Sequence, residues 1–313
     1  MIVSKRHFFK FYFALVFSTL FFIALIIILI YTYIKRINDN ASKNFDFLMP
    51  IFAIFILLLA IYNIYRCIKN APNIKMDKDF ISFNNEIFST EDIGKVILSG
   101  KHDFNNDFFI LTEIEGASIK FKNGIKKIIF DDMYSNTWEM KSFLKQVIID
   151  KKVYDPLQFS FSKVENYGNE NFENFKGNQF LTFRGFSFWV IIIFLIYAAF
   201  DFTKMHIVNS IYITLGGALV WFLLHIYFLH YFQVSNNYLV IRNHIQFWKK
   251  VPYLLSDIKE VVFETQPKMP NCLRVITKDF KTKLYPAGTL SNKTWDALQQ
   301  KFREHKIKVR IEI

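Results

Sequence analysis

Four long apolar runs divide this chain, and between them lie segments in which apolar and polar residues alternate singly. The runs cover residues 11–34, 47–65, 185–200 and 207–232. Crossing a bilayer takes about 20 mostly apolar residues, within a range of about 17–25, and the first, second and fourth runs meet that length. The third is short, and it spans only if Phe183 and the residues after Asp201 lie at the interfaces, with Trp189 or Tyr197 as anchors. The pattern therefore predicts a polytopic membrane protein.

Two other interpretations of these runs are disfavoured. Uncharged stretches of this length are rare in the cores of water-soluble proteins. A removable signal peptide does not fit the first run, because its apolar part is too long and no small-x-small cleavage site follows it.

The runs form two pairs, because short connections at residues 35–46 and 201–206 make the members of each pair antiparallel neighbours. Two helical hairpins put both ends and the middle of the chain on one side of the membrane. Near the runs, that side carries twelve Lys and Arg residues, whereas the two connections carry only Lys35, Arg36, Lys43 and Lys204. This bias predicts a bacterial inner-membrane protein with cytoplasmic N- and C-termini.

Four short blocks occur twice, in the same order, once after each hairpin. "FISFNNEIF" and "EDIGKVIL" match "YLVIRNHIQF" and "SDIKEVVF", and "SIKFKNGIKKIIF" and "SNTWE" match "LRVITKDFKTKLY" and "SNKTWD". The shared order predicts an internal duplication.

The repeated blocks predict a small antiparallel β-sheet closed by a C-terminal helix. Apolar and polar residues alternate in the first three blocks, as in half-buried strands. Asn123-Gly124 predicts a two-residue hairpin turn with positive φ at both positions, and Lys278-Asp279 is its expected counterpart. The last block starts a helix, with Ser or Asn as a cap and Glu139 or Asp296 in the first turn. The expected core stripes are Met140, Phe143, Leu144 and Val147 in the first helix, and Trp295, Leu298 and Phe302 in the second, so that Trp138 lies opposite its own stripe.

This arrangement resembles the bacterial pleckstrin-homology-like membrane proteins of the YcxB type, present as two divergent copies. Asp257-Ile258, residues 273–284, Tyr285-Pro286 and the helix from Asn292 carry the resemblance. The first copy departs from it, because Phe130-Asp131 replaces the aromatic-Pro pair. The resemblance implies an α+β membrane protein in which each transmembrane hairpin precedes a pleckstrin-homology-like domain, and it implies little chemistry. The expected segments are a first hairpin (1–70), a first β domain (71–150), a flexible linker (151–184), a second hairpin (185–235) and a second β domain (236–313).

The 313 residues contain no nucleotide-binding, hydrolase or metalloprotease motif, and we expect no enzyme activity, cofactor, metal or nucleic-acid partner. Cys67 and Cys272 have no spaced partners, so neither a disulfide nor a zinc site is predicted. His225 and His230 share the fourth run, about 140° apart on a helix, which favours packing roles. Asp103, Asp107, Glu113 and Glu115, near Lys101-His102, predict a solvated face. All four runs lack charged residues, which disfavours a transporter or channel.

The charge is unevenly divided between the two copies. Residues 236–313 carry 15 basic and 7 acidic side chains (net +8), and residues 77–150 carry 9 and 13 (net −4). A basic surface is attracted to anionic headgroups, and the first copy, with Asp131 and Asp132, is an alternative target. The predicted contact residues are Lys278, Lys281, Lys283, Lys301, Arg303, Lys306, Lys308 and Arg310.

Two functions stay open from the sequence. One is a non-enzymatic membrane protein whose paired cytoplasmic domains bind a protein partner or the membrane surface. The other is a membrane-embedded immunity protein against a toxin, in which the hairpins would carry the specificity.

Overall fold

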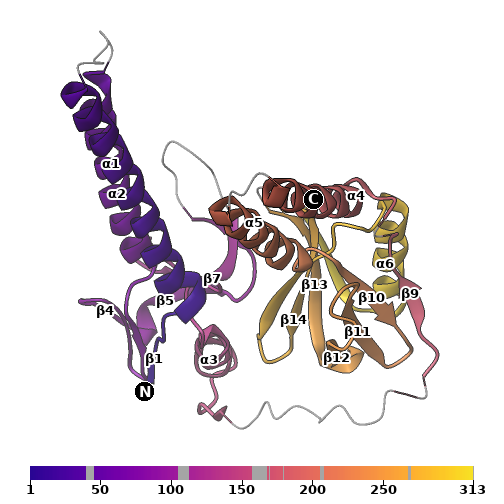
Figure 1. Cartoon of the computed structure of the whole chain (residues 1–313). Coiled ribbons are helices and arrows are strands. Elements are labelled where there is room, and N and C mark those ends of the chain that lie inside the picture. Colours follow the sequence, from indigo (N-terminus) through magenta and orange to yellow (C-terminus); the bar gives the residue numbers. More distant parts are fainter. Residues whose placement is uncertain are drawn as a thin grey trace. The chain divides into compact units, whose positions relative to one another are not determined.

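A computed structural model describes residues 1–39, 46–104, 113–156, 168, 170–178, 180–204, 208–266 and 269–312. The chain divides into two compact units, Met1–Pro156 and Leu157–Ile313 (Figure 1). Each unit combines a pair of helices with small sheets of mainly antiparallel strands, so the fold is α+β.

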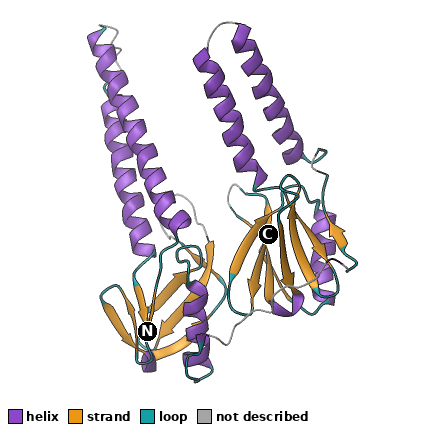
Figure 2. Cartoon of the chain, turned by 60° about the horizontal axis from the view of Figure 1, so that its bottom comes forward, coloured by secondary structure: helices purple, strands orange, loops and turns teal. Residues whose placement is uncertain are grey.

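Two long helices dominate the first unit. A π-helical turn, η1 (Phe8–Phe13), leads into α1 (Ala14–Asn38), and α2 (Leu48–Asn70) returns beside it (Figure 2). Pro50 lies in the first turn of α2, where its missing N–H breaks no helical hydrogen bond. Asn63 of α2 donates its side-chain amide to Ser18 Oγ of α1 at 3.1 Å, which gives a polar group on an apolar helix a partner.

The sheets of the first unit follow α2. Their strands are β2 (Ile74–Met76), β3 (Phe80–Phe83), β4 (Glu86–Ser89), β5 (Ile93–Ile97), β6 (Lys101–Asp103), β7 (Glu113–Phe121) and β8 (Lys126–Phe130). The first sheet has the order β1-β2-β3-β4, where β1 is Ile2–Val3. In the second sheet β7 pairs with β5 and β6 along one edge and with β8 along the other. The helix α3 (Thr137–Phe143) continues as a π-helix, η3 (Leu144–Ile149). As predicted, Met140, Phe143 and Leu144 are buried in the core.

The second unit contains α4 (Phe183–Lys204), α5 (Val208–Ile226) and two four-stranded sheets with orders β12-β11-β10-β9 and β15-β14-β13-β16. Its strands are β9 (Glu173–Phe175), β10 (His230–Val234), β11 (Tyr238–Asn243), β12 (Lys250–Leu254), β13 (Ile258–Thr265), β14 (Asn271–Thr277), β15 (Thr282–Pro286) and β16 (Lys308–Glu312). The helix α6 (Asn292–Glu304) buries Trp295, Leu298 and Phe302, as predicted.

The last apolar run does not form one helix to its end. α5 stops at Ile226, and Phe232, expected within the run, is fully buried in strand β10. The run is long because apolar strand residues follow directly on apolar helix residues. His225 therefore lies in the helix and His230 in a strand, which overturns their expected placement around one helical axis.

The two units match in backbone detail. A bulge follows the Asp-Ile step in both, between Ile93 and Lys95 in β5 and between Ile258 and Glu260 in β13. In both, a lysine amide of the next hairpin donates to the carbonyl of the aspartate in that step, from Lys122 to Asp92 and from Lys278 to Asp257, each at 2.8 Å. Such agreement is what an internal duplication predicts.

The two hairpin turns are equivalent, but the predicted alignment of their residues is shifted by one position. Gly124 (φ +87°) and Phe280 (φ +64°) occupy the same left-handed position, so Asn123-Gly124 corresponds to Asp279-Phe280. Each amide there donates to a carbonyl three residues back, so these are type I turns followed by a left-handed bulge residue. Only the second of the two expected positive φ angles is present.

In each unit, a short strand that precedes the helix pair adds an edge strand to the sheet that follows the helix pair. β1 pairs with β2, and β9 pairs with β10, both antiparallel. Phe175 of β9 is buried in the core of the second unit. Residues 173–175 therefore belong to a sheet, whereas the sequence predicts a flexible linker there.

The two "SN(x)TW" strings begin helices by different means. Ser291 Oγ caps α6 by accepting from the Thr294 amide at 3.3 Å. Asn136 instead donates to Val3 O and accepts from the Lys5 amide, so it fastens the N-terminal strand. Asp296 lies beyond the first turn, contrary to expectation. Trp138 is half-buried and Trp295 is buried, in line with their predicted different roles.

Candidate functional site

The eight predicted basic residues lie on three elements of the second unit. Lys278, Lys281 and Lys283 belong to the β14–β15 hairpin, and Lys301 and Arg303 belong to α6. Lys306 follows that helix, and Lys308 and Arg310 lie on β16. In the sequence these eight residues share only their positive charge, and the sequence does not show whether they lie on one surface.

Four of the eight are engaged in ion pairs within the unit. Lys308 lies 2.8 Å from Glu260, and Arg310 lies 3.2 Å from Glu312. Lys301 pairs with Glu173 of β9 at 2.9 Å, and Lys281 pairs with Asp279 at 3.0 Å. Each of these pairs offsets part of the positive charge of the second unit. Lys278, Lys283, Arg303 and Lys306 are exposed.

The ion pair at Glu260 follows from its burial. Its side chain is 0 % exposed on β13. Burial alone raises the pKa of Glu260, but the hydrogen bond from Lys308 and the charge of Arg310 outweigh it and leave the pKa below its usual value. The net positive charge of the sequence therefore overstates the positive charge available to a partner.

The acidic residues expected to attract this surface are also engaged. Lys141 Nζ lies 2.6 Å from Asp131 Oδ1, and both side chains are shut off from solvent. Asp132 lies 2.5 Å from Lys10 of η1. Both carboxylates are thus paired inside the first unit, and their pairing with the basic segment stays a prediction.

The predicted acidic cluster is partly buried. Glu115 is fully buried and accepts from the Gly100 amide at 2.7 Å, whereas Asp103 and Glu113 face each other at exposed positions of β6 and β7. The expectation of a wholly solvated face is wrong at Glu115, and Asp107 lies outside the described residues. Over the part of the chain that the structure describes, no three His, Cys, Asp or Glu side chains gather as metal ligands.

The end of α5 is fixed to the sheets by three hydrogen bonds. Asn243 Nδ2 donates to Ile226 O at 2.7 Å, and the His244 amide donates to Leu229 O at 3.0 Å. From the other sheet, the Gly288 amide donates to Phe228 O at 2.8 Å. The β11–β12 loop and the end of β15 therefore lie at the base of this helix.

A half-buried His–Tyr network occupies this base. His230 Nδ1 lies 3.1 Å from Pro286 O, so Nδ1 carries the proton, and the hydroxyls of Tyr253 and Tyr285 lie 2.5 Å apart. Burial lowers the pKa of His230 to about 4 and raises the pKa of Tyr285. These groups stay neutral near pH 7, so the network suits packing better than proton transfer.

Sequence reasoning missed an aromatic pair in the β11–β12 loop. Phe247 and Trp248 are 70 % and 68 % exposed, and Lys249 and Lys250 follow them directly. The string "FWKK" is visible in the sequence, but the sequence does not show that it lies at the base of α5.

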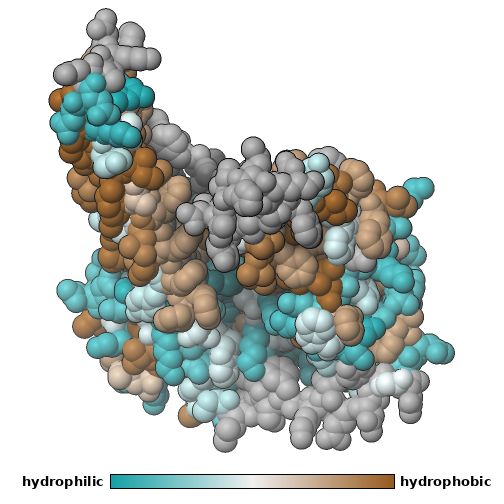
Figure 3. Space-filling model, in the orientation of Figure 1, coloured by the Kyte–Doolittle hydropathy of each residue, from teal (hydrophilic) through white to brown (hydrophobic). Residues whose placement is uncertain are grey.

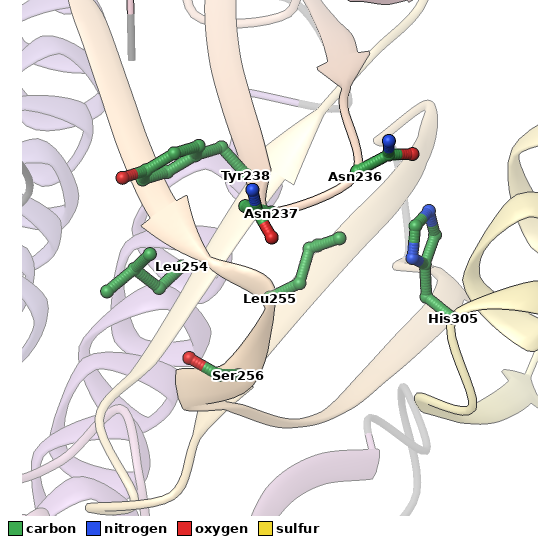
Figure 4. A pocket seen from close by; sticks show the side chains of 7 residues that line it. All are labelled: Asn236, Asn237, Tyr238, Leu254, Leu255, Ser256 and His305. Atoms are coloured by element: carbon green, nitrogen blue, oxygen red, sulfur yellow. The ribbon is translucent and has the colours of Figure 1, made fainter. Parts of the chain in front are cut away.

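An open cavity of about 380 Å³ lies at the other end of β10. Figure 4 shows its lining, from the β10–β11 turn, the end of β12 and His305 after α6. The lining residues are Asn236, Asn237, Tyr238, Leu254, Leu255, Ser256 and His305. They include no carboxylate, lysine or arginine, so the cavity presents no cluster of charged side chains that would hold an anion or a metal ion.

No protein-family model matches the chain, and no curated protein matches it significantly. The resemblance to pleckstrin-homology-like membrane proteins stays a prediction.

Proposed function

We propose that this chain is a non-enzymatic integral membrane protein that holds two pleckstrin-homology-like domains against the cytoplasmic surface of a bacterial inner membrane. There the second domain, which carries the excess of positive charge, binds the membrane surface or a protein partner. The observation that carries this proposal is the strand closure in both units.

Each closing strand fixes the orientation of its sheet relative to the helix pair of the same unit. β1 and β2 flank α1 and α2 in the sequence and pair with each other, as do β9 and β10 around α4 and α5. Both ends of each helix pair therefore enter one sheet. If the helices cross a bilayer, the sheets lie directly at its surface and present a fixed face to it.

The exposed surface of the helices supports the membrane setting. α1 has no buried residue, and α2 buries only Ala53 and Ala60. At 1.5 Å per residue these helices are about 38 Å and about 35 Å long, compared with about 30 Å for a hydrocarbon core. Figure 3 shows the apolar surface that runs along α1 and α2, above the more hydrophilic sheets. An apolar surface of this extent favours lipid as its solvent.

The apolar stretches of the second pair are shorter. In the described part of the chain they cover Gly185–Tyr197 of α4 and Thr214–Leu223 of α5. Their helices are 22 and 19 residues long, which is enough for a second membrane hairpin within the proposal.

Membrane fractionation tests the membrane setting. We expect the full-length chain to stay with membranes after alkaline carbonate extraction and to leave them only with detergent. Release by carbonate would overturn the proposal. A photo-crosslinker placed at Lys278 or Lys306, both exposed, tests the binding role in native membranes. Adducts with lipid or with one protein support it, and absence of any adduct at both positions contradicts it.

A further inference from the structure

The base of α5 carries three aromatic and three basic side chains, which we term the aromatic–basic patch. Its members are Tyr227, Phe247, Trp248, Lys249, Lys250 and Lys283.

The loop that carries most of the patch is ordered by its own hydrogen bonds. Asn243 Oδ1 accepts from the amides of Ile245 and Gln246, at 2.9 and 3.1 Å, and the Lys249 amide donates to Gln246 O at 2.9 Å. The rings of Phe247 and Trp248 meet edge to face, with centroids 5.0 Å apart. Two large rings are thus held in solvent by a folded loop, an arrangement that costs free energy unless something apolar receives them.

The loop is attached to the helix that would enter the membrane. The same Asn243 donates its Nδ2 to Ile226 O, the last residue of α5, and the next residue bonds to Leu229. Tyr227, directly after the helix, donates its hydroxyl to Leu284 O at 3.4 Å and is 46 % exposed. The patch therefore lies where α5 ends.

The charges of the patch repel one another. Lys250 lies directly opposite Arg242 in the β11–β12 register, and like charges at paired positions destabilise a sheet. Burial and then the neighbouring charge of Lys249 lower the pKa of Lys283. No ion pair joins Lys249, Lys250 or Lys283 to an acidic side chain of the described residues, in contrast to Lys301 and Lys308.

We propose that the aromatic–basic patch docks onto the anionic phospholipid headgroups of the leaflet from which α5 emerges. This inference rests on the membrane setting proposed above and names the surface that contacts lipid. Trp and Tyr favour the headgroup level of a bilayer, where one side of the ring is apolar and the other is wet. Lysines near an anionic leaflet add attraction, each strengthening contact about fivefold at moderate ionic strength. An anionic layer would also relieve the repulsion of Lys283 by Lys249 and of Lys250 by Arg242.

The test uses the full-length chain in vesicles of two compositions, pure phosphatidylcholine and a phosphatidylcholine–phosphatidylglycerol mixture. Trp248→Cys, in a background of Cys67→Ser and Cys272→Ala, carries a fluorophore that is quenched by lipids with a nitroxide near the headgroup. We expect strong quenching in the anionic vesicles and several-fold weaker quenching in the neutral ones. A fluorophore at Lys293→Cys, on the exposed side of α6, should not be quenched in either.

Charge reversal separates headgroup recognition from simple proximity. Lys249→Glu with Lys250→Glu should reduce quenching at position 248 in anionic vesicles several-fold. The matched control, Lys151→Glu with Lys152→Glu, makes the same charge change at two adjacent exposed positions outside the patch and should leave the quenching unchanged.

Each remaining outcome contradicts the inference. Equal quenching in both vesicles, or equal loss with both double variants, would show that the patch does not recognise anionic lipid. Absence of quenching in a chain that resists carbonate would overturn the patch and leave the membrane setting standing. A photo-crosslinker placed at position 248 in native membranes should form lipid adducts, and adducts with a protein alone would make the patch a protein-docking surface instead. Release by carbonate would instead overturn the proposed function itself.

Discussion

Lys141 and Asp131 form an ion pair whose side chains are 0 % and 1 % exposed. Removing one partner of such a pair leaves an uncompensated buried charge, which typically costs about 3–5 kcal/mol. We therefore expect Lys141→Met to lower the free energy of unfolding by that amount, measured by denaturant unfolding in detergent.

The double variant Lys141→Met with Asp131→Leu should recover most of this loss, because no charge is then left buried. Lys152→Met, at an exposed position, serves as the control for the loss of one lysine. A loss of less than about 1 kcal/mol in Lys141→Met would show that this pair is not closed to water.

His230 makes stability depend on pH. Its folded-state pKa of about 4 lies below the unfolded value of 6.5, so the unfolded chain binds the proton first as pH falls. Stability from this residue is complete above pH 6.5 and is lost as pH falls through about 4. A shift of this size corresponds to about 3 kcal/mol.

Replacement by Asn keeps an N–H donor for Pro286 O and removes the titration. We expect the unfolding free energy of the wild type to fall more steeply than that of His230→Asn between pH 6.5 and 4. Other titrating groups cancel in the difference between the two curves. Parallel curves would contradict a neutral, half-buried His230.

At the level of elements, β9 closes the second unit through one buried side chain. Phe175 is 3 % exposed, and Phe→Ala changes in cores cost about 3–5 kcal/mol. We expect Phe175→Ala to release β9 and to speed cleavage by a glutamate-specific protease at Glu170 and Glu173. Asn171→Ala, at an exposed position of the same segment, should leave the cleavage rate unchanged. Rapid cleavage of the wild type would contradict the closing strand.

The elements that could be predicted from the sequence are those with a local period. Apolar and polar residues alternate along most of β7, and the apolar stripes of α3 and α6 repeat every three or four residues. β1 and β9 were missed because they have two and three residues, too few to show a period. Their partners lie beyond a helix pair, so only the three-dimensional fold brings them together.

The candidate site was predicted only in part for the same reason. Composition identifies the basic segment. Whether a lysine of that segment is engaged in an ion pair depends on which carboxylates of β13 lie next to it. Glu260 lies opposite Lys308 because β13 and β16 pair in parallel, a contact that no local pattern reports. Likewise, "FWKK" becomes a candidate surface only once its loop is known to lie at the end of α5.

At the scale of the whole molecule, orientation is the property that most constrains function. In each unit the strands on both sides of the helix pair join one sheet, so the two ends of each pair lie on the same side of any membrane they cross. Twelve basic residues near the runs on the β-domain side, compared with four in the connections, predict that this side is cytoplasmic.

Cysteine labelling of intact cells measures this orientation directly. In a background of Cys67→Ser and Cys272→Ala, one variant carries Asp39→Cys, just after α1, and another carries Lys293→Cys in α6. A maleimide that cannot cross the inner membrane should label position 39 in intact cells and position 293 only after the membrane is opened. This follows because Lys35 and Arg36, although basic, are outnumbered by the charges near the sheets. Labelling at position 293 but not at position 39 would reverse the orientation and place both β domains outside the cytoplasm. Labelling of both positions would mean that the two helix pairs do not each return to the same side.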